Sequence, residues 1–241
     1  MIELAKAGRT LTYADKVLGY SPIAYWQLNE AAGTIAACSV NGAQSGNYVG
    51  VTLGQTGIGD GETCPLFDGT NDYVDTYSAT LDAKFDGDEG SFMCWVKVNT
   101  GVWTDGVNRY PILFGEDNTN RIYLVKLAAN NTLEYTRKAD DNLDDLHSLT
   151  SFSLTTWFQA LITWSIAGTA QATYINGVET AVSPTVIANN YVGNLTAGWT
   201  CIGAKTIPPE ALDGLWSGWL AHCAIWDSVL TPAQIADLAV I

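Results

Sequence analysis

Oxygen-bearing side chains cluster at one turn of the chain, where Asp68, Asn71 and Asp72 stand between two apolar runs. Gly69 and Asn71 readily adopt the positive φ angles of tight turns, so we predict a β-hairpin over Phe67–Val74. Carboxylate and amide oxygens are the ligands that hard cations such as Ca²⁺ prefer. Asp68 and Asp72 are therefore candidate metal ligands. The alternative is that both carboxylates accept hydrogen bonds from the backbone of the turn itself.

Residue types that perform nucleophilic or acid–base chemistry are scattered along the chain. His147 and His222 are far apart in the sequence, and neither stands in a serine or cysteine nucleophile pattern. The segment Asp140–Asp145 begins like a calcium-binding loop but lacks the glycine and the bidentate glutamate that complete one. The alternative for this segment is a solvated acidic loop. These residues predict no catalytic site.

Aromatic side chains near the ends of expected strands are the remaining signal of ligand binding. Flat rings stack on the apolar faces of sugar rings, while carboxylates and amides read the hydroxyl groups. Trp103, within Gly101–Gly106, is the candidate we expect to be most exposed. The alternative is that most of these rings belong to the core, because large aromatic side chains are usually well buried. The candidate ligand-binding residues are Trp103, Asp105, Tyr110, Trp199 and Trp216.

Charge and composition exclude several classes of partner. The chain has 241 residues with 11 basic and 25 acidic side chains, which gives a net charge of −14. Nucleic-acid binding needs clustered lysine and arginine, so we expect no nucleic-acid partner. No apolar run approaches 18 residues, which argues against membrane insertion. The first residues also lack the basic region and apolar core of a secretion signal.

The five cysteines are odd in number and widely spaced, with no C-x-x-C pair. Cys94, Cys201 and Cys223 fall within apolar segments, where a free cysteine behaves as a small hydrophobic residue. We predict that these three are buried and reduced, without a metal or redox role. Cys38 and Cys64 fall at the edges of loops or strands, so one disulfide between them stays open.

About a dozen short apolar segments separated by turn signals predict an all-β sandwich or barrel with little helix. The pair Asn176-Gly177 gives the strongest hairpin signal, because it is the preferred sequence of a type I′ turn. One strand is expected from Tyr48 to Leu53. Short helices are expected near both termini, with Thr12 and Thr231 as their capping residues.

An ordered series of motifs over about residues 22–238 resembles the laminin-G-like branch of the concanavalin A-like lectin/glucanase superfamily. The motifs lie at Ala24–Glu30 (A-Y-W-x-L-x-E), Phe67–Val74 (F-D-G-x-x-D-Y-V), Cys94–Lys97, Trp157–Trp164, Tyr174–Gly177, Ile202–Gly203 and Gly218–Ile235. The resemblance implies an all-β, two-sheet antiparallel jelly-roll sandwich with short N- and C-terminal helices, in which the first and closing strands are neighbours. The segment Tyr13–Leu18 before Ser21–Trp26 is also similar to many such proteins in bacteriophage genomes.

Two departures from the family pattern bear on metal binding and catalysis. Relatives hold a structural Ca²⁺ with a glutamate at the position of Glu30 and a late aspartate. Here the acidic pair of the last strand is replaced by Ala221 and His222, and Cys38 replaces an aspartate after the first strand. Glu30 keeps its place, with a capping or edge carboxylate as the alternative reading. The candidate metal ligands are Glu30, Asp68 and Asp72.

Glycosidases of this superfamily carry their catalytic carboxylates two and four residues apart on one strand, which places them on one face. No E-x-D-x-x-E pattern occurs in the chain, and its glutamates are scattered singly. We therefore expect that the protein is not an enzyme.

The expected organisation is an N-terminal docking segment over residues 1–21, followed by a laminin-G-like β-sandwich over residues 22–241. The function that we expect is that of a non-catalytic phage virion protein, a capsid decoration or tail component, assembled in the host cytoplasm. Its lectin-like sandwich would mediate adhesion, with virion proteins or a cell-surface glycan as partners. The alternative is a secreted or cell-surface carbohydrate-binding module assisted by Ca²⁺, and a glycoside hydrolase or lyase is the least favoured reading. Assembly into a homo-oligomer stays open.

Overall fold

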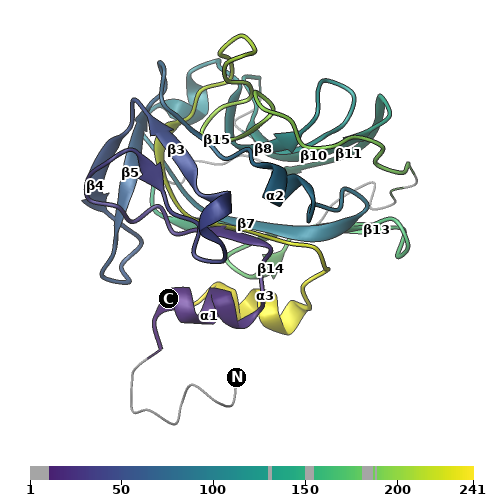
Figure 1. The fold of residues 1–241 in the computed structure, drawn as a ribbon, viewed down its shortest axis with the longest axis horizontal. Coiled ribbons are helices and arrows are strands. Elements are labelled where there is room, and N and C mark those ends of the chain that lie inside the picture. The colour runs from purple at the N-terminus through teal and green to yellow at the C-terminus, as the bar shows by residue number, and fades with distance from the viewer. Residues whose placement is uncertain (1–10, 130–131, 150–154, 181–186, 188) are drawn as a thin grey trace.

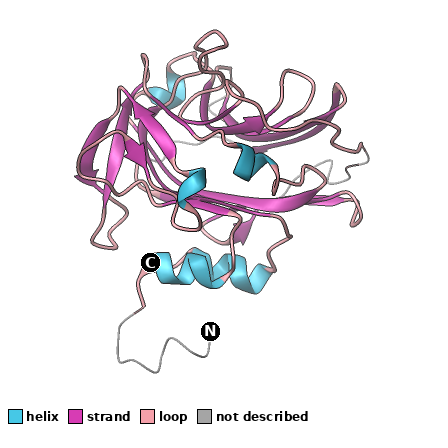
Figure 2. Cartoon of the chain, in the orientation of Figure 1, coloured by secondary structure: helices cyan, strands magenta, loops and turns pink. Residues whose placement is uncertain are grey.

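The chain folds into two antiparallel β-sheets packed face to face, with two short helices outside one of them (Figure 1, Figure 2). The computed structural model describes residues 11–129, 132–149, 155–180, 187 and 189–241. Its helices are α1 (Tyr13–Gly19), α2 (Ala79–Asp82) and α3 (Pro232–Leu238), with 3₁₀ turns η2 (Gly42–Gln44) and η3 (Val102–Thr104). The predicted two-sheet sandwich with short terminal helices is confirmed.

Sheet A has the strand order β14-β13-β12-β7-β16-β5-β4, and β1 also pairs with β16. Its strands are β1 (Ala24–Trp26), β4 (Thr52–Thr56), β5 (Thr63–Asp68), β7 (Glu89–Val98), β12 (Phe158–Ser165), β13 (Ala170–Ile175), β14 (Val178–Glu179) and β16 (Ser217–Trp226). Ala24 pairs with Ile225, so the predicted neighbourhood of the first and closing strands is confirmed. Asn176 and Gly177 both have positive φ between β13 and β14, as a type I′ turn requires.

Sheet B has the strand order β11-β10-β9-β8-β15-β6-β3-β2. Its strands are β2 (Ile35–Ala36), β3 (Gly46–Val49), β6 (Tyr73–Asp75), β8 (Arg109–Gly115), β9 (Arg121–Lys126), β10 (Leu133–Ala139), β11 (Asn142–Leu149) and β15 (Thr200–Ile202).

The acidic segment Asp140–Asp145 is not one loop, contrary to that reading of the sequence. Asp140 and Asp141 have φ values of 50° and 63° and make the two-residue turn between β10 and β11. Aspartate tolerates this left-handed conformation better than most residues, so the turn is tight and the strand resumes at Asn142. His147 lies in β11, and its side chain is outside the described part of the chain.

The segment Phe67–Val74 is a corner between the two sheets, so the predicted hairpin is wrong. β5 belongs to sheet A and pairs with β16, whereas β6 belongs to sheet B and pairs with β15. Gly69 adopts φ 80° as expected, but the turn leads the chain across the sandwich. Phe67 and Val74 still meet the same core, because they approach it from opposite sheets. Turn residues alone cannot distinguish these two outcomes.

The strand expected from Tyr48 to Leu53 is likewise divided between the sheets. Gly50, at φ 79°, separates β3 in sheet B from β4 in sheet A. A side chain there is also excluded by space, because a Cβ on Gly50 would lie 2.1 Å from Oδ1 of Asp72. The β propensity is continuous from Tyr48 to Leu53, but the backbone changes from sheet B to sheet A at Gly50, so one predicted strand becomes two.

The main core lies between the inner faces of the two sheets. It combines large aromatic side chains from both, such as Trp26, Phe92 and Trp164 from sheet A and Phe114 from sheet B. The ring centroids of Trp26 and Phe114 are 6.3 Å apart, and those of Phe92 and Phe114 are 6.2 Å apart in an edge-on contact. This apolar burial is the dominant favourable term in the stability of the sandwich.

Helices α1 and α3 cover the outer face of sheet A and form a second apolar core with it (Figure 1). Thr12 and Thr231 cap them through reciprocal capping boxes, which confirms both predicted caps. The hydroxyl of Tyr13 accepts a hydrogen bond from Nε1 of Trp95 at 2.8 Å and donates to the carbonyl of Leu238 at 2.6 Å. Among the described residues, no helix is long and apolar enough to cross a membrane.

Candidate functional site

Two of the predicted ligand-binding residues, Trp103 and Trp216, lie in the core between the sheets. Trp103 is 5% exposed and Trp216 is fully buried. The turn η3 directs Val102 and Trp103 inward, and the Trp103 ring lies 6.4 Å from that of Phe158. The expectation that Trp103 is an exposed loop residue is therefore wrong. The glycines around it make the turn but do not orient its side chain outward.

Asp105 forms a structural ion-pair cluster with two basic side chains. Its Oδ1 is 2.6 Å from Nζ of Lys126, whose side chain is fully buried, and its Oδ2 is 2.6 Å from Nε of Arg109. Burial acts to raise the pKa of Asp105, but the hydrogen bonds from Lys126 and Arg109 outweigh it and lower the pKa below its ordinary value. Both carboxylate oxygens are thus engaged within the protein.

Tyr110 and Trp199, the other two predicted ligand-binding residues, meet on the outer face of sheet B. They form a cluster there with Tyr123, which we call the outer aromatic cluster. The rings of Tyr110 and Tyr123 come from neighbouring strands β8 and β9, with centroids 5.3 Å apart. The three residues are 8–9% exposed, so ring edges rather than whole faces reach solvent.

Arg121 lies over the outer aromatic cluster. Its guanidinium carbon is 5.2 Å from the centroid of the Tyr123 ring and 5.8 Å from that of Trp199, within the range of cation–π contacts. Gly115 makes this approach available, because it is the cross-strand partner of Arg121 and carries no side chain. A Cβ on Gly115 would lie 2.6 Å from Cβ of Arg121.

The polar atoms of the outer aromatic cluster have no hydrogen-bond partner among the described residues. The hydroxyls of Tyr110 and Tyr123 and the indole N–H of Trp199 make no hydrogen bond with any residue that the structure describes. Burial raises the pKa of Tyr110, so its hydroxyl stays protonated and able to donate near neutral pH. Rings with one apolar end and one free polar end are typical of binding surfaces.

Tyr123 and Arg121 also belong to this surface, although the sequence did not lead us to predict either residue. Both lie in the run Arg121–Lys126, where buried Ile122 and Leu124 alternate with them. Side chains two apart on a strand share a face, so this alternation is the signal that could have found them. The sequence of β9 alone does not show that Arg121 and Tyr123 meet Trp199, which directly precedes β15 on the other side of β8.

The predicted metal ligands are held by hydrogen bonds within the protein. Glu30 accepts from the backbone N–H of Ala37 at 2.8 Å and from the hydroxyl of Tyr48 at 2.6 Å. Asp72 accepts from the N–H of Asp68 at 2.8 Å, and Asp68 accepts from a neighbouring turn amide at 2.7 Å. The described residues contain no group of three His, Cys, Asp or Glu side chains that could hold a metal ion. Calcium binding stays a prediction.

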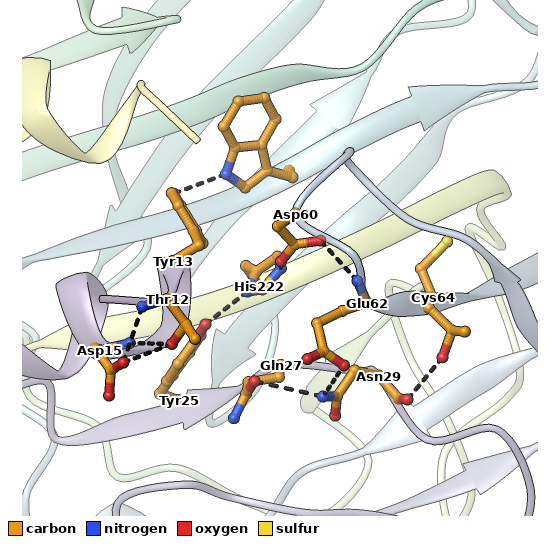
Figure 3. A network of polar contacts seen from close by, with 12 residues as sticks. Thr12, Tyr13, Asp15, Tyr25, Gln27, Asn29, Asp60, Glu62, Cys64 and His222 are labelled. Atoms are coloured by element: carbon orange, nitrogen blue, oxygen red, sulfur yellow. Dashed lines mark hydrogen bonds and ion pairs between the residues drawn. The ribbon is translucent and has the colours of Figure 1, made fainter. Parts of the chain in front are cut away.

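A buried polar network lies between α1 and sheet A (Figure 3). Nε2 of His222 is 2.9 Å from Oδ2 of Asp60, and its Nδ1 is 2.6 Å from the hydroxyl of Tyr25. The Tyr13 ring stands edge-on to the imidazole at 4.8 Å between centroids. His222 has φ 50° where the β16 register shifts, and it is 1% exposed. The network joins α1, β1, β16 and the loop between β4 and β5 inside the protein.

All five cysteines are free and buried. The predicted burial of Cys94, Cys201 and Cys223 as free thiols is confirmed, and the disulfide left open for Cys38 and Cys64 is not formed. Burial raises the pKa of the Cys64 thiol to about 12 and raises that of Cys201 further. These thiols are therefore protonated and poorly reactive at neutral pH.

Comparisons with known proteins found solved structures that share this fold. The fourth domain of AbnA, an extracellular GH43 arabinanase from Geobacillus stearothermophilus solved with arabinotriose, superposes with a TM-score of 0.63 at 17% identity, covering 91% of this chain and 98% of that one. Trypanosoma rangeli sialidase in complex with sialic acid superposes at 0.63 and 10% identity over 90% of this chain. The binding domain of botulinum neurotoxin serotype D superposes at 0.61 and 15% identity over 91% of this chain.

These identities establish a likeness of fold. The chain spans 32% of the sialidase and 51% of the neurotoxin domain. No curated protein matches the chain. A family model described as the concanavalin A-like lectin/glucanases superfamily matches residues 68–236, which is more than half of the chain. The matched region runs from the corner after β5 into α3 and includes every residue of the outer aromatic cluster, so the chain belongs to the concanavalin A-like lectin/glucanases superfamily.

Proposed function

We propose that this protein is a non-catalytic glycan-binding module that holds its ligand on the outer face of sheet B. The observation that carries the proposal is the outer aromatic cluster, in which two tyrosine hydroxyls and one indole N–H have no described partner. Helices α1 and α3 cover the outer face of sheet A, whereas the outer aromatic cluster lies on the outer face of sheet B. Ring edges with hydrogen-bonding groups suit the mixed apolar and hydroxylated surface of a sugar.

The fold relatives support a carbohydrate as the ligand class. The arabinanase domain was solved with arabinotriose and the sialidase with sialic acid, and the first of these covers nearly the whole of its domain. A non-catalytic role is supported by the sequence, which lacks the closely spaced strand carboxylates that glycosidases of this fold use. Asp105, the one acidic side chain among the predicted ligand-binding residues, is engaged by Lys126 and Arg109.

The setting that we propose is a bacteriophage virion, as a capsid decoration or tail component. The support is the resemblance of the segment Tyr13–Trp26 to phage proteins and a net charge of −14, which suits solubility at high copy number. Virion proteins and a cell-surface glycan are then the partners. The protein should copurify with phage particles through a density gradient, and its absence from particles would favour the secreted or cell-surface alternative instead.

The calcium-assisted form of that alternative has a direct test. Thermal unfolding of the protein would be followed in calcium chloride and in EGTA. Binding of Ca²⁺ to the native state raises the unfolding temperature in proportion to the logarithm of its concentration. An equal unfolding temperature in both conditions would remove Glu30, Asp68 and Asp72 as metal ligands.

Glycan binding is tested by removing the two free hydroxyls without disturbing the fold. The double variant Tyr110→Phe/Tyr123→Phe keeps both rings, so we expect an unchanged unfolding midpoint. The affinity for the best glycan on an array should fall about tenfold, because two hydrogen bonds of about 0.5–1.5 kcal/mol each are lost.

Tyr48→Phe is the matched control. The hydroxyl of Tyr48 donates to Glu30 at 2.6 Å inside the protein, so this variant should lose stability and keep its affinity. Wild-type protein that binds no glycan on the array would refute the proposal. So would a double variant that binds as tightly as the wild type.

A further inference from the structure

Two basic side chains stand directly opposite each other beside the outer aromatic cluster. Arg121 of β9 is the cross-strand partner of Lys138 of β10, so both side chains project from the outer face of sheet B. Like charges in this position repel each other and destabilise the strand pair. The juxtaposition is unusual in a chain with 25 acidic and 11 basic residues.

Arg121 also differs from the other two arginines that the structure describes. Arg109 pairs with Asp105, and Arg137 pairs with Asp88 at 2.9 Å. Arg121 makes no ion pair within the described residues, and its hydrogen-bond partner is the neutral side-chain oxygen of Asn118. Its Nε is buried without a partner. The guanidinium thus contacts aromatic rings and one amide, and no carboxylate of the described residues pairs with it directly.

Asp117 is one negative neighbour of Arg121: burial acts to raise its pKa, but hydrogen bonds from Thr119 and Asn120 and the nearby charge of Arg121 lower it. Lys138 is paired with Asp141, whose side chain is 73% exposed. Glu134 shares the outer face of sheet B, but its cross-strand partner is Val125, four residues along β9 from Arg121. Its carboxylate accepts from the hydroxyl of Thr136 at 3.3 Å. Two basic side chains thus stand side by side over the β9 end of the aromatic cluster, and neither Asp117 nor Glu134 forms an ion pair with Arg121 among the described residues.

We propose that the glycan bound by this surface is acidic, carrying a carboxylate or a sulfate that Arg121 binds with support from Lys138. This inference rests on the proposed function. The anionic group would accept hydrogen bonds from the guanidinium, while the sugar ring contacts Tyr123 and Trp199. Arginine suits this role because its planar donors match the oxygens of carboxylate and sulfate. Binding also relieves the repulsion between Arg121 and Lys138.

The experiment compares matched oligosaccharides that differ in charge alone. Titration calorimetry would measure oligogalacturonate against its methyl ester, and a sulfated galactan oligosaccharide against the unsulfated one. For wild-type protein we expect one acidic member to bind about 10- to 100-fold more tightly than its neutral partner. The pair that shows the preference distinguishes carboxylate from sulfate. The preference should weaken as salt is raised.

The variant Arg121→Gln should lose this preference, so that the charged and neutral members of each pair bind with equal affinity. Lys84→Gln removes the same charge from an exposed position at the end of α2 and should change nothing. Because Arg121 packs on two rings, Lys138→Gln provides a second variant with less influence on folding, and it should reduce the preference severalfold.

Each outcome is decisive. Equal affinity for the charged and neutral members of both pairs overturns the acidic-glycan inference but leaves the proposed glycan-binding function standing. An acid preference that survives in both Arg121→Gln and Lys138→Gln also overturns the acidic-glycan inference. Absence of binding to any glycan on the array overturns the proposed function, and this inference with it.

Discussion

The ion-pair cluster around Asp105 leads to a specific prediction about stability. The change Asp105→Asn keeps the shape of the side chain and removes its charge. Lys126, whose side chain is fully buried, then loses its counter-ion, as does Arg109, whose side chain is 14% exposed. The carbonyl of Val107, 3.0 Å from Nζ of Lys126, remains as a neutral acceptor.

The expected loss follows from the two contacts at 2.6 Å. Hydrogen bonds between charged groups are roughly twice as strong as neutral ones, so neutralising the acceptor costs about 1 kcal/mol for each bond. The buried ammonium adds about 1 kcal/mol more, below the ~3–5 kcal/mol of a fully buried pair, because the Asp105 side chain is 22% exposed. We therefore expect unfolding free energy to fall by about 3 kcal/mol.

Urea denaturation at pH 7, followed by tryptophan fluorescence, measures this loss. Asp213→Asn is the matched control, since Asp213 pairs with Lys205 at 2.9 Å with side chains 59% and 26% exposed. An exposed pair of this kind contributes less than about 1 kcal/mol. The double variant Asp105→Asn/Lys126→Met should recover about 1–2 kcal/mol relative to the sum of the single changes, because no ammonium is left unpaired.

The pH dependence has a definite sign. The pKa of Asp105 is lowered in the folded protein from its ordinary value of 3.8. Its stabilising contribution is therefore complete above the unfolded-state pKa and disappears as the pH falls through the folded-state pKa. The difference between wild type and Asp105→Asn should shrink below about pH 4. If Asp105→Asn loses no more stability than Asp213→Asn at pH 7, the assignment of Asp105 as a structural ion-pair partner is refuted.

Three further predictions concern the helix layer, the close strand contact and the thiols. Tyr13→Phe should reduce the unfolding free energy by about 1–3 kcal/mol, because the buried Nε1 of Trp95 loses its hydrogen-bond acceptor. Tyr20→Phe removes a partly buried hydrogen bond to Asp237 and should cost less than half as much. Equal losses in the two variants would contradict the role of Tyr13 in docking α1. Gly115→Ala should cost about 1–3 kcal/mol, because its Cβ would lie 2.6 Å from Cβ of Arg121, whereas Gly42→Ala meets nothing within 4 Å and should be neutral in the same urea assay. The five buried thiols should react with Ellman's reagent only as fast as the protein unfolds, and one thiol reacting at the rate of free cysteine would contradict their burial.

The sequence by itself determined the fold class and the features that depend on neighbouring residues. The caps at Thr12 and Thr231 and the Asn176-Gly177 turn follow from side chains that bond or relax their own backbone, so no distant contact is needed. The pairing of β1 with β16 followed from the family motifs, and burial of the strand cysteines followed from apolar sequence runs.

Only the tertiary structure decided where the chain changes sheets and which aromatic residues face outward. Gly50 and Gly69 permit a turn, but a hairpin and a corner use the same residues, and the choice depends on pairing with β15 and β16. Trp103 and Trp199 carry similar local sequence signals, yet one enters the core and the other joins Tyr110 and Tyr123 outside. The reason is physical: a ring's exposure is set by which strands stand beside it, and those strands are distant in the sequence.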